Sequence, residues 1–127
     1  MIAVDTSSWI AFFSTGEPPG DDTALVESAL ADHQACLPPV VLTELLSDPR
    51  LPRTVGALLS QLPTLDVDPA YWERAGQLRA KLLALKHRAR LADTLIAQSC
   101  IDHDVRLVTR DADFRHFARV GRLRLAL

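Results

Sequence analysis

Short apolar runs alternate along this chain with longer segments whose apolar residues recur at helical spacing. Short segments rich in apolar residues that predict strands lie at residues 1–4, 35–37, 65–67, 105–108 and 123–127. Segments with helical spacing or helix-start signals lie between them, at residues 9–13, 21–33, 40–47, 53–62, 69–86, 91–103 and 112–119. Strands that alternate with helices predict an α/β fold, in which helices flank both faces of a central parallel sheet.

The clearest helical pattern covers residues 69–86, where one apolar stripe contains Tyr71, Ala75, Leu78, Leu82 and Leu85. Pro39 suits the first turn of the helix predicted over residues 40–47, because a backbone N–H at that position has no partner within the helix. Residues 16–20 carry glycines and prolines and predict a loop.

The composition is that of a globular protein, with 48% apolar and 24% charged residues in a chain of 127. We expect a single domain over residues 1–127. Cys36 and Cys100 have apolar neighbours and predict buried thiols. No basic segment precedes the apolar start, and no apolar stretch of roughly 20 residues occurs, so we expect a soluble, cytoplasmic protein that spans no membrane.

The charges are separated along the chain. Residues 1–70 contain two basic and ten acidic residues, whereas residues 71–127 contain twelve basic and six acidic ones. This separation suits an acidic pocket with a basic rim, as a phosphodiester substrate requires. Charges scattered over solvated helix faces would produce the same count.

Four acidic residues stand where a parallel sheet would bring them to one edge. Asp5 and Asp111 each follow a predicted strand directly, and Asp93 lies in the first turn of the helix before the second of these strands. Glu44 lies about 60° outside the apolar arc of its predicted helix, so that it can face a pocket beside the sheet. Ligands of parallel sheets gather beyond the carboxyl ends of the strands.

Carboxylates that converge in this way repel one another, and a hard cation offsets the repulsion. Mg²⁺ or Mn²⁺ is the expected ion, since both prefer oxygen ligands. Asp113, two residues after Asp111, is a further candidate ligand. Each acid taken singly has a simpler explanation, as a helix cap, a charge that complements a helix dipole, or a solvated side chain.

Four segments resemble, in the right order, the motifs of the PIN-domain ribonuclease family. Residues 5–10 resemble the opening D-x-S-x-(W/L/V)-(I/L) motif, and residues 42–46 the second, centred on a helical glutamate. Residues 91–97 resemble the third, L-x-D-(A/T)-L-I-A, and residues 107–114 the fourth, (L/V)-x-T-x-D-x-D-F. Together they extend over nearly the whole chain.

The resemblance implies roles for particular residues. The catalytic, metal-binding acids it implies are Asp5, Glu44, Asp93 and Asp111, with Asp113 as a fifth. The hydroxyls of Ser7 and Thr109 map to positions that support these carboxylates. Residues 86–91 depart from the pattern, because they are basic and lack the glycine often found before the third motif, so Asp93 could be placed differently.

The resemblance also implies a three-layer fold with about five parallel strands, and the small size points to the VapC-like toxins of toxin–antitoxin pairs. Such a protein hydrolyses RNA phosphodiester bonds, forms a homodimer and binds a cognate antitoxin. Apolar side chains including Trp9, Phe12 and Phe13 agree with a homodimer, since they exceed what one small sheet covers. A non-catalytic PIN-like interaction module is the alternative, although such modules usually lose one or more of the acids.

Three arginines lie beside the third and fourth motifs and are candidates for binding RNA phosphates: Arg88, Arg90 and Arg110. Arg110 could equally form a salt bridge at the sheet edge. Two other enzyme classes fit less well. A haloacid dehalogenase-like phosphotransferase needs an acid where this chain has Ser7, and a Toprim-type nuclease normally has a glutamate where it has Asp5.

Overall fold

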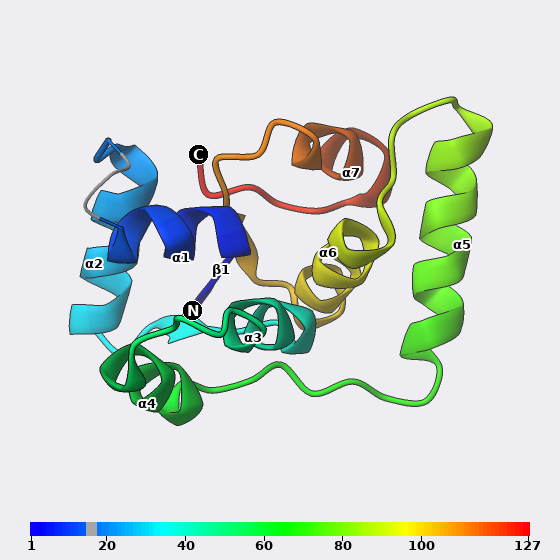
Figure 1. The fold of residues 1–127 in the computed structure, drawn as a ribbon. Coiled ribbons are helices and arrows are strands. Elements are labelled where there is room, and N and C mark those ends of the chain that lie inside the picture. The colour runs from blue at the N-terminus through cyan, green and yellow to red at the C-terminus, as the bar shows by residue number, and fades with distance from the viewer. Residues whose placement is uncertain (15–17) are drawn as a thin grey trace.

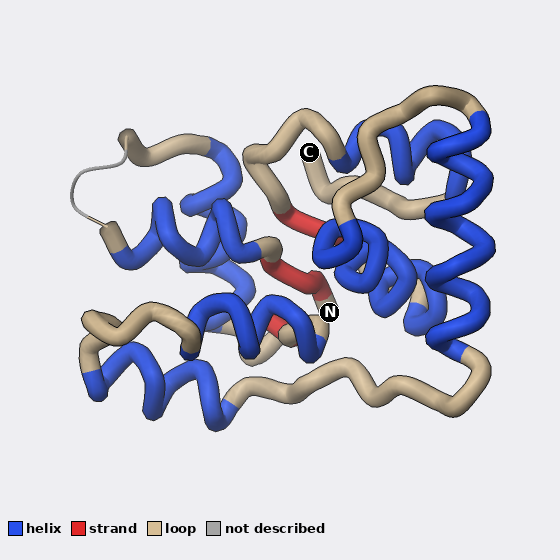
Figure 2. Tube along the Cα trace, turned by 45° about the vertical axis from the view of Figure 1, so that its right-hand side comes forward, coloured by secondary structure: helices blue, strands red, loops and turns tan. Residues whose placement is uncertain are grey.

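Three parallel strands lie at the centre of the structure, a computed structural model of the chain. β1 (Ile2–Val4) lies between β2 (Ala35–Cys36) and β3 (Arg106–Val108). Figure 2 shows these strands in the middle of the molecule with helices around them. The predicted α/β fold with a parallel sheet is thus confirmed, and the carboxyl ends of the strands meet at one edge.

The sheet continues at each edge through a single parallel bridge. Leu37, next to β2, pairs with Thr64, and Leu107 in β3 pairs with Leu125. The expected sheet of five strands therefore has three strands in the described residues, flanked by two singly bridged segments. The strands predicted at residues 65–67 and 123–127 are wrong, because neither segment has a second bridge to extend the pairing.

The structure describes residues 1–14 and 18–127, and this part of the chain has seven helices. They are α1 (Thr6–Phe13), α2 (Asp21–Ala31), α3 (Pro39–Leu46), α4 (Arg53–Gln61), α5 (Tyr71–Ala84), α6 (Leu91–His103) and α7 (Phe114–Gly121). Figure 1 shows α1 and α2 on one side of the strands, and α6 on the other with α5 beyond it. No helix in the described part of the chain has the length and apolarity that crossing a membrane requires.

Most helix predictions agree closely with the structure. Helix α6 has the predicted bounds, and Pro39 occupies the first turn of α3 as expected. The first helix begins earlier than predicted, at Thr6, so that Asp5 occupies its N-cap position. The loop predicted at residues 16–20 lies partly outside the described residues, and residues 18–20 belong to no helix or strand.

The core is built from the facing sides of the helices and the sheet. Of the stripe predicted on α5, four residues are buried and Leu85 is exposed, because the helix ends at Ala84. Both cysteines are buried, as predicted. Trp9 is fully buried and stacks on Phe13 with ring centroids 5.6 Å apart, so it is not part of the surface apolar excess inferred from the sequence.

Candidate active site

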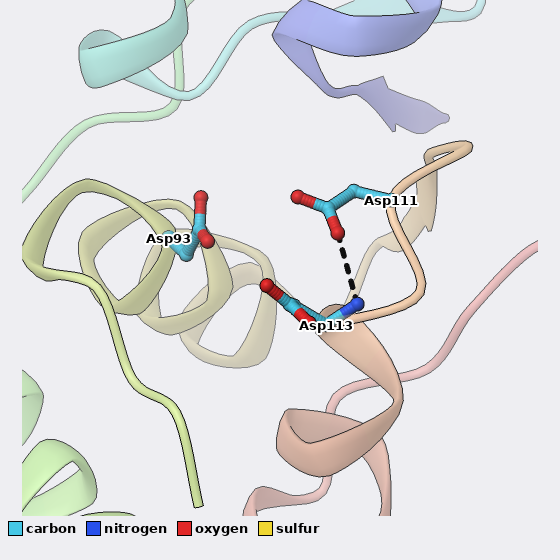
Figure 3. Close-up of side chains that lie close together, drawn as sticks. All are labelled: Asp93, Asp111 and Asp113. Atoms are coloured by element: carbon cyan, nitrogen blue, oxygen red, sulfur yellow. Dashed lines mark hydrogen bonds between the residues drawn. The ribbon is translucent and has the colours of Figure 1, made fainter.

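Three carboxylates from different segments converge beyond the carboxyl ends of the strands. Asp93 lies in the first turn of α6, Asp111 in the loop after β3, and Asp113 immediately before α7. One carboxylate oxygen from each lies within 4.8 Å of the other two, and all three side chains are partly buried. Figure 3 shows them pointing toward a common centre.

Asp5 lies next to this cluster, at the end of β1, and is only 4% exposed. Its Oδ2 accepts hydrogen bonds of 2.8 Å from the hydroxyls of Ser7 and Thr109. Burial raises the pKa of Asp5, and the two hydroxyls, Thr109 more strongly, oppose that rise. The backbone N–H groups of Thr6 and Ser7, at the start of α1, also lower the pKa of Asp5, so its carboxylate interacts with the first turn of α1 as well as with the two hydroxyls.

Asp93 shows how strongly the acids of this region interact. Burial, followed by repulsion from Asp5 and Asp111, raises its pKa to about 6, and Glu44 adds a smaller repulsion. The positive charge of Arg90 acts in the opposite direction. A half-buried carboxylate that resists ionisation among other carboxylates is a suitable partner for a cation.

Asp111 and Asp113 are also linked through the backbone. Asp111 Oδ1 accepts a 2.9 Å hydrogen bond from the backbone N–H of Asp113, and the N–H of Asp111 donates to Thr109 Oγ1 at 3.0 Å. Asp111 therefore has a local structural role besides its place in the cluster. The hydrogen bond from the backbone N–H of Asp113 occupies Asp111 Oδ1, and Figure 3 shows the second carboxylate oxygen of Asp111 turned toward Asp93.

Glu44 lies on α3, outside the group of three close carboxylates. It is exposed, and its Oε1 accepts a 2.8 Å hydrogen bond from Thr6 Oγ1, which connects α3 to the start of α1. Its repulsion still reaches Asp93. Glu44 thus lies at the solvent-exposed margin of the acidic region.

The donor set fits a hard divalent cation. All the converging side chains offer carboxylate oxygens, which Mg²⁺ and Mn²⁺ prefer. The histidines of the described residues are engaged elsewhere or lie apart from the acids. His87 and His116 stack on each other with ring centroids 4.4 Å apart, and His103 bonds to the backbone of Asp66.

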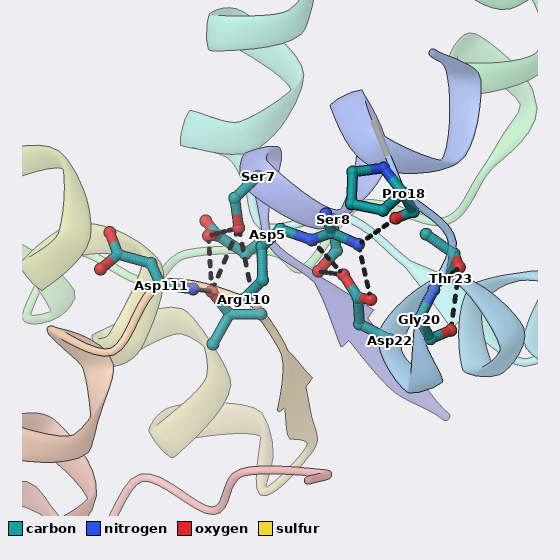
Figure 4. Close-up of polar contacts among 10 residues, drawn as sticks. Asp5, Ser7, Ser8, Pro18, Gly20, Asp22, Thr23, Arg110 and Asp111 are labelled. Atoms are coloured by element: carbon teal, nitrogen blue, oxygen red, sulfur yellow. Dashed lines mark hydrogen bonds and ion pairs between the residues drawn. The ribbon is translucent and has the colours of Figure 1, made fainter. Parts of the chain in front are cut away.

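The three candidate arginines have different surroundings. Arg88 has an exposed side chain whose Nη1 lies 3.9 Å from Asp113 Oδ2, and Arg90 is exposed at the start of α6. Arg110 points away from the acids toward Asp22, as Figure 4 shows. The geometry thus favours the alternative of a salt bridge at the sheet edge for Arg110. Asp22 was missed by sequence reasoning, because an acid in the first turn of a helix has an ordinary explanation.

The comparisons with known proteins agree with this geometry. The sequence matches the model of the PIN domain family over residues 2–120, and the chain belongs to that family. Ribonuclease VapC11 of Mycobacterium tuberculosis is 36% identical to it over 132 aligned residues, which cover 99% of this chain and 98% of the relative. The resemblance to PIN domains and to their VapC-like branch is thus confirmed.

Solved structures share the fold over nearly the whole chain. VapBC2 from Rickettsia felis, bound to a DNA fragment from their promoter, matches with a TM-score of 0.73 and 24% identity, over 98% of this chain and 97% of that chain. VapBC-5 from M. tuberculosis, a member of the VapBC family of toxin-antitoxin systems, matches with a TM-score of 0.68 and 22% identity, over 98% and 95%. At such identities the likeness concerns the fold alone.

Proposed function

We propose that this chain is a metal-dependent endoribonuclease that hydrolyses RNA phosphodiester bonds, as the toxin of a toxin–antitoxin pair. The observation that carries the proposal is the convergence of Asp93, Asp111 and Asp113 beside the buried Asp5. A relative of nearly equal length named as a VapC ribonuclease supports the RNA substrate.

The residues divide the work of the reaction. Asp93, Asp111 and Asp113 would hold a Mg²⁺ or Mn²⁺ ion, with Asp5 completing the site. Such an ion would lower the pKa of a bound water and offset negative charge that develops on the phosphate. Glu44, at the margin, would orient the attacking water.

The substrate is held by groups at the rim of the site. Arg88 and Arg90 are exposed beside the acids and would bind backbone phosphates of the RNA. Contacts of this kind position RNA without reading its sequence, so the choice of target RNA depends on other features.

The partners follow from the same family. The solved VapBC structures support a cognate antitoxin, and we propose that its C-terminal segment lies across the acidic site. A basic side chain of that segment can reach Asp5 or Asp93 and replace the charge of the metal. We also propose a homodimer.

The test is cleavage of single-stranded RNA by the purified protein with Mg²⁺ or Mn²⁺, with and without excess EDTA. We expect the native protein to cleave RNA in the presence of the metal and excess EDTA to abolish this cleavage. We expect Asp111→Asn not to cleave RNA. Undiminished cleavage in EDTA would remove the metal mechanism. Binding of RNA without cleavage under any metal would support the alternative, a non-catalytic interaction module. Sequencing of RNA 5′ ends after brief induction in cells would identify the target.

A further inference from the structure

Three consecutive residues after β3 make contacts in three directions. Thr109 donates to Asp5, Arg110 forms an ion pair with Asp22 on α2, and Asp111 joins the acidic cluster. Figure 4 shows the Arg110 side chain and the Asp111 carboxylate on opposite sides of this loop. Residues 109–113 belong to no helix or strand, so side-chain contacts of this loop contribute to the position of Asp111.

The contact between Arg110 and Asp22 consists of two hydrogen bonds between a partly exposed guanidinium and a buried carboxylate. Arg110 Nε donates to Asp22 Oδ2 and Nη2 to Oδ1, both at 2.8 Å. Asp22 is 6% exposed, and the hydrogen bonds from Arg110 are the main reason that its pKa falls to about 2. Paired bonds between a guanidinium and a carboxylate fix direction as well as distance.

The pair is connected to α1 through a buried hydroxyl. Ser8 is fully buried, and its Oγ donates a 2.8 Å hydrogen bond to Asp22 Oδ2. Its neighbour Ser7 donates to Asp5. One turn of α1 thus holds Asp5 with one serine and Asp22 with the next. Gly20 leaves room for the pair, since a Cβ there would lie 3.0 Å from Asp22 Oδ1.

We propose that Arg110 and Asp22 are positioning residues, whose ion pair anchors the loop after β3 to α1 and α2 and so holds Asp111 at the metal-binding distance from Asp93. This rests on the proposed function. In this role neither residue would contact the metal or the RNA. The ion pair acts through Thr109 and Asp111, the chain neighbours of Arg110.

The direct test measures Mn²⁺ binding to the metal-free protein by the loss of the free-ion EPR signal, well below the melting temperature. Asp22→Asn keeps the shape of the side chain and removes its charge. Arg110→Gln removes the guanidinium group that donates both hydrogen bonds to Asp22. We expect each to weaken Mn²⁺ binding about tenfold, the usual cost of losing a residue that orients a metal ligand. The double variant is expected to bind Mn²⁺ as tightly as the single variant with the lower affinity, because both changes break the same contact.

Two further variants serve as control and reserve. Arg124 pairs with Asp104 at 2.9 Å, and both side chains are exposed, so Arg124→Gln removes a surface ion pair and is expected to leave Mn²⁺ binding unchanged. Arg110→Lys keeps the positive charge but cannot make the paired hydrogen bonds of the guanidinium. It replaces the neutral variants in the Mn²⁺ measurement if those do not fold. High Mn²⁺ concentration is expected to restore cleavage in every folded variant.

The results separate this proposal from the proposed function. Wild-type affinity for Mn²⁺ in Asp22→Asn, in a protein that binds Mn²⁺ and cleaves RNA, would overturn the positioning role alone. Weaker RNA retention in Arg110→Gln with unchanged Mn²⁺ binding would make Arg110 a phosphate ligand and also overturn it. A wild-type protein that neither binds Mn²⁺ nor cleaves RNA would overturn both.

Discussion

The hydroxyl of Thr109 donates a 2.8 Å hydrogen bond to the buried carboxylate of Asp5, joining residues that are 104 positions apart in the sequence. The hydroxyl oxygen of Thr109 also accepts a 3.0 Å hydrogen bond from the backbone N–H of Asp111. One threonine therefore connects the end of β1 to the loop after β3. Asp5 and Asp111 are held on either side of this single hydroxyl.

Thr109→Val removes that hydroxyl at nearly constant volume. The carboxylate of Asp5 then loses one of two hydroxyl donors while remaining buried, which costs about 1–3 kcal/mol of unfolding free energy. We expect this loss in urea titrations in EDTA, together with slower RNA cleavage. Thr109→Ser keeps the hydroxyl and serves as the control. Equal stability of the valine and serine variants would show that the bond contributes nothing.

Asp93→Asn tests whether Asp93 holds a metal or only complements the dipole of α6. Mg²⁺ bound to the folded state alone raises the melting temperature of the native protein. We expect a much smaller rise in Asp93→Asn, and no RNA cleavage. If Asp93 serves only the helix dipole, calorimetry will show equal Mg²⁺ shifts in both proteins, and cleavage will survive.

The raised pKa of Asp93 predicts a stability difference that depends on pH. In metal-free protein the unfolded chain releases the Asp93 proton near pH 4, whereas the folded chain keeps it until about pH 6. Stability from this group is therefore present below pH 4 and is lost as the pH rises through about 6. Since Asp93 is partly exposed, we expect the free energy of unfolding of metal-free Asp93→Asn to be higher than that of the native protein by on the order of 1 kcal/mol at pH 7.5.

The pH dependence has an internal control of opposite sign. The pKa of Asp22 is lowered to about 2, so its contribution is present above pH 4 and is lost only as the pH falls toward 2. The contribution of Asp22 to stability therefore stays constant across the pH range in which Asp93 titrates.

The free energy of unfolding is measured by denaturant titration in EDTA between pH 4 and 7.5. If the difference in this free energy between Asp93→Asn and the native protein does not grow with pH, the expected repulsion is contradicted.

The proposed assembly predicts two observations in solution. Large apolar side chains remain exposed on several helices, including Ile10 on α1, Leu46 on α3, and Trp72 and Leu83 on α5. We expect light scattering to give the mass of a dimer, and a co-expressed antitoxin to co-purify. A monomer at roughly tens of micromolar that retains no co-expressed partner would contradict both expectations.

Local sequence patterns were sufficient for much of the fold. Helix α6 could be bounded correctly from its apolar residues, and α3 was predicted to within one residue at each end from Pro39 and the spacing after it. Hydrophobic periodicity and helix-start residues act within one or two turns, so a single stretch of sequence carries the information. The outer strands could not be predicted in this way. The segments that contain Leu65 and Leu125 are rich in apolar residues, as true strands are, but each edge of the sheet pairs there through one bridge only, at Thr64 and at Leu125.

The acids of the site were predictable as a set, because strand ends and family motifs mark Asp5, Asp93 and Asp111 in the sequence itself. Their relation to Arg110 was not. Asp21 and Asp22 are adjacent acids in the first turn of α2, and nothing local distinguishes them. Only Asp22 is buried, because packing of α2 brings it to Ser8 and to an arginine 88 positions away. The sequence thus determined which residues carry charge and where helices begin, and tertiary contacts decided which charges meet.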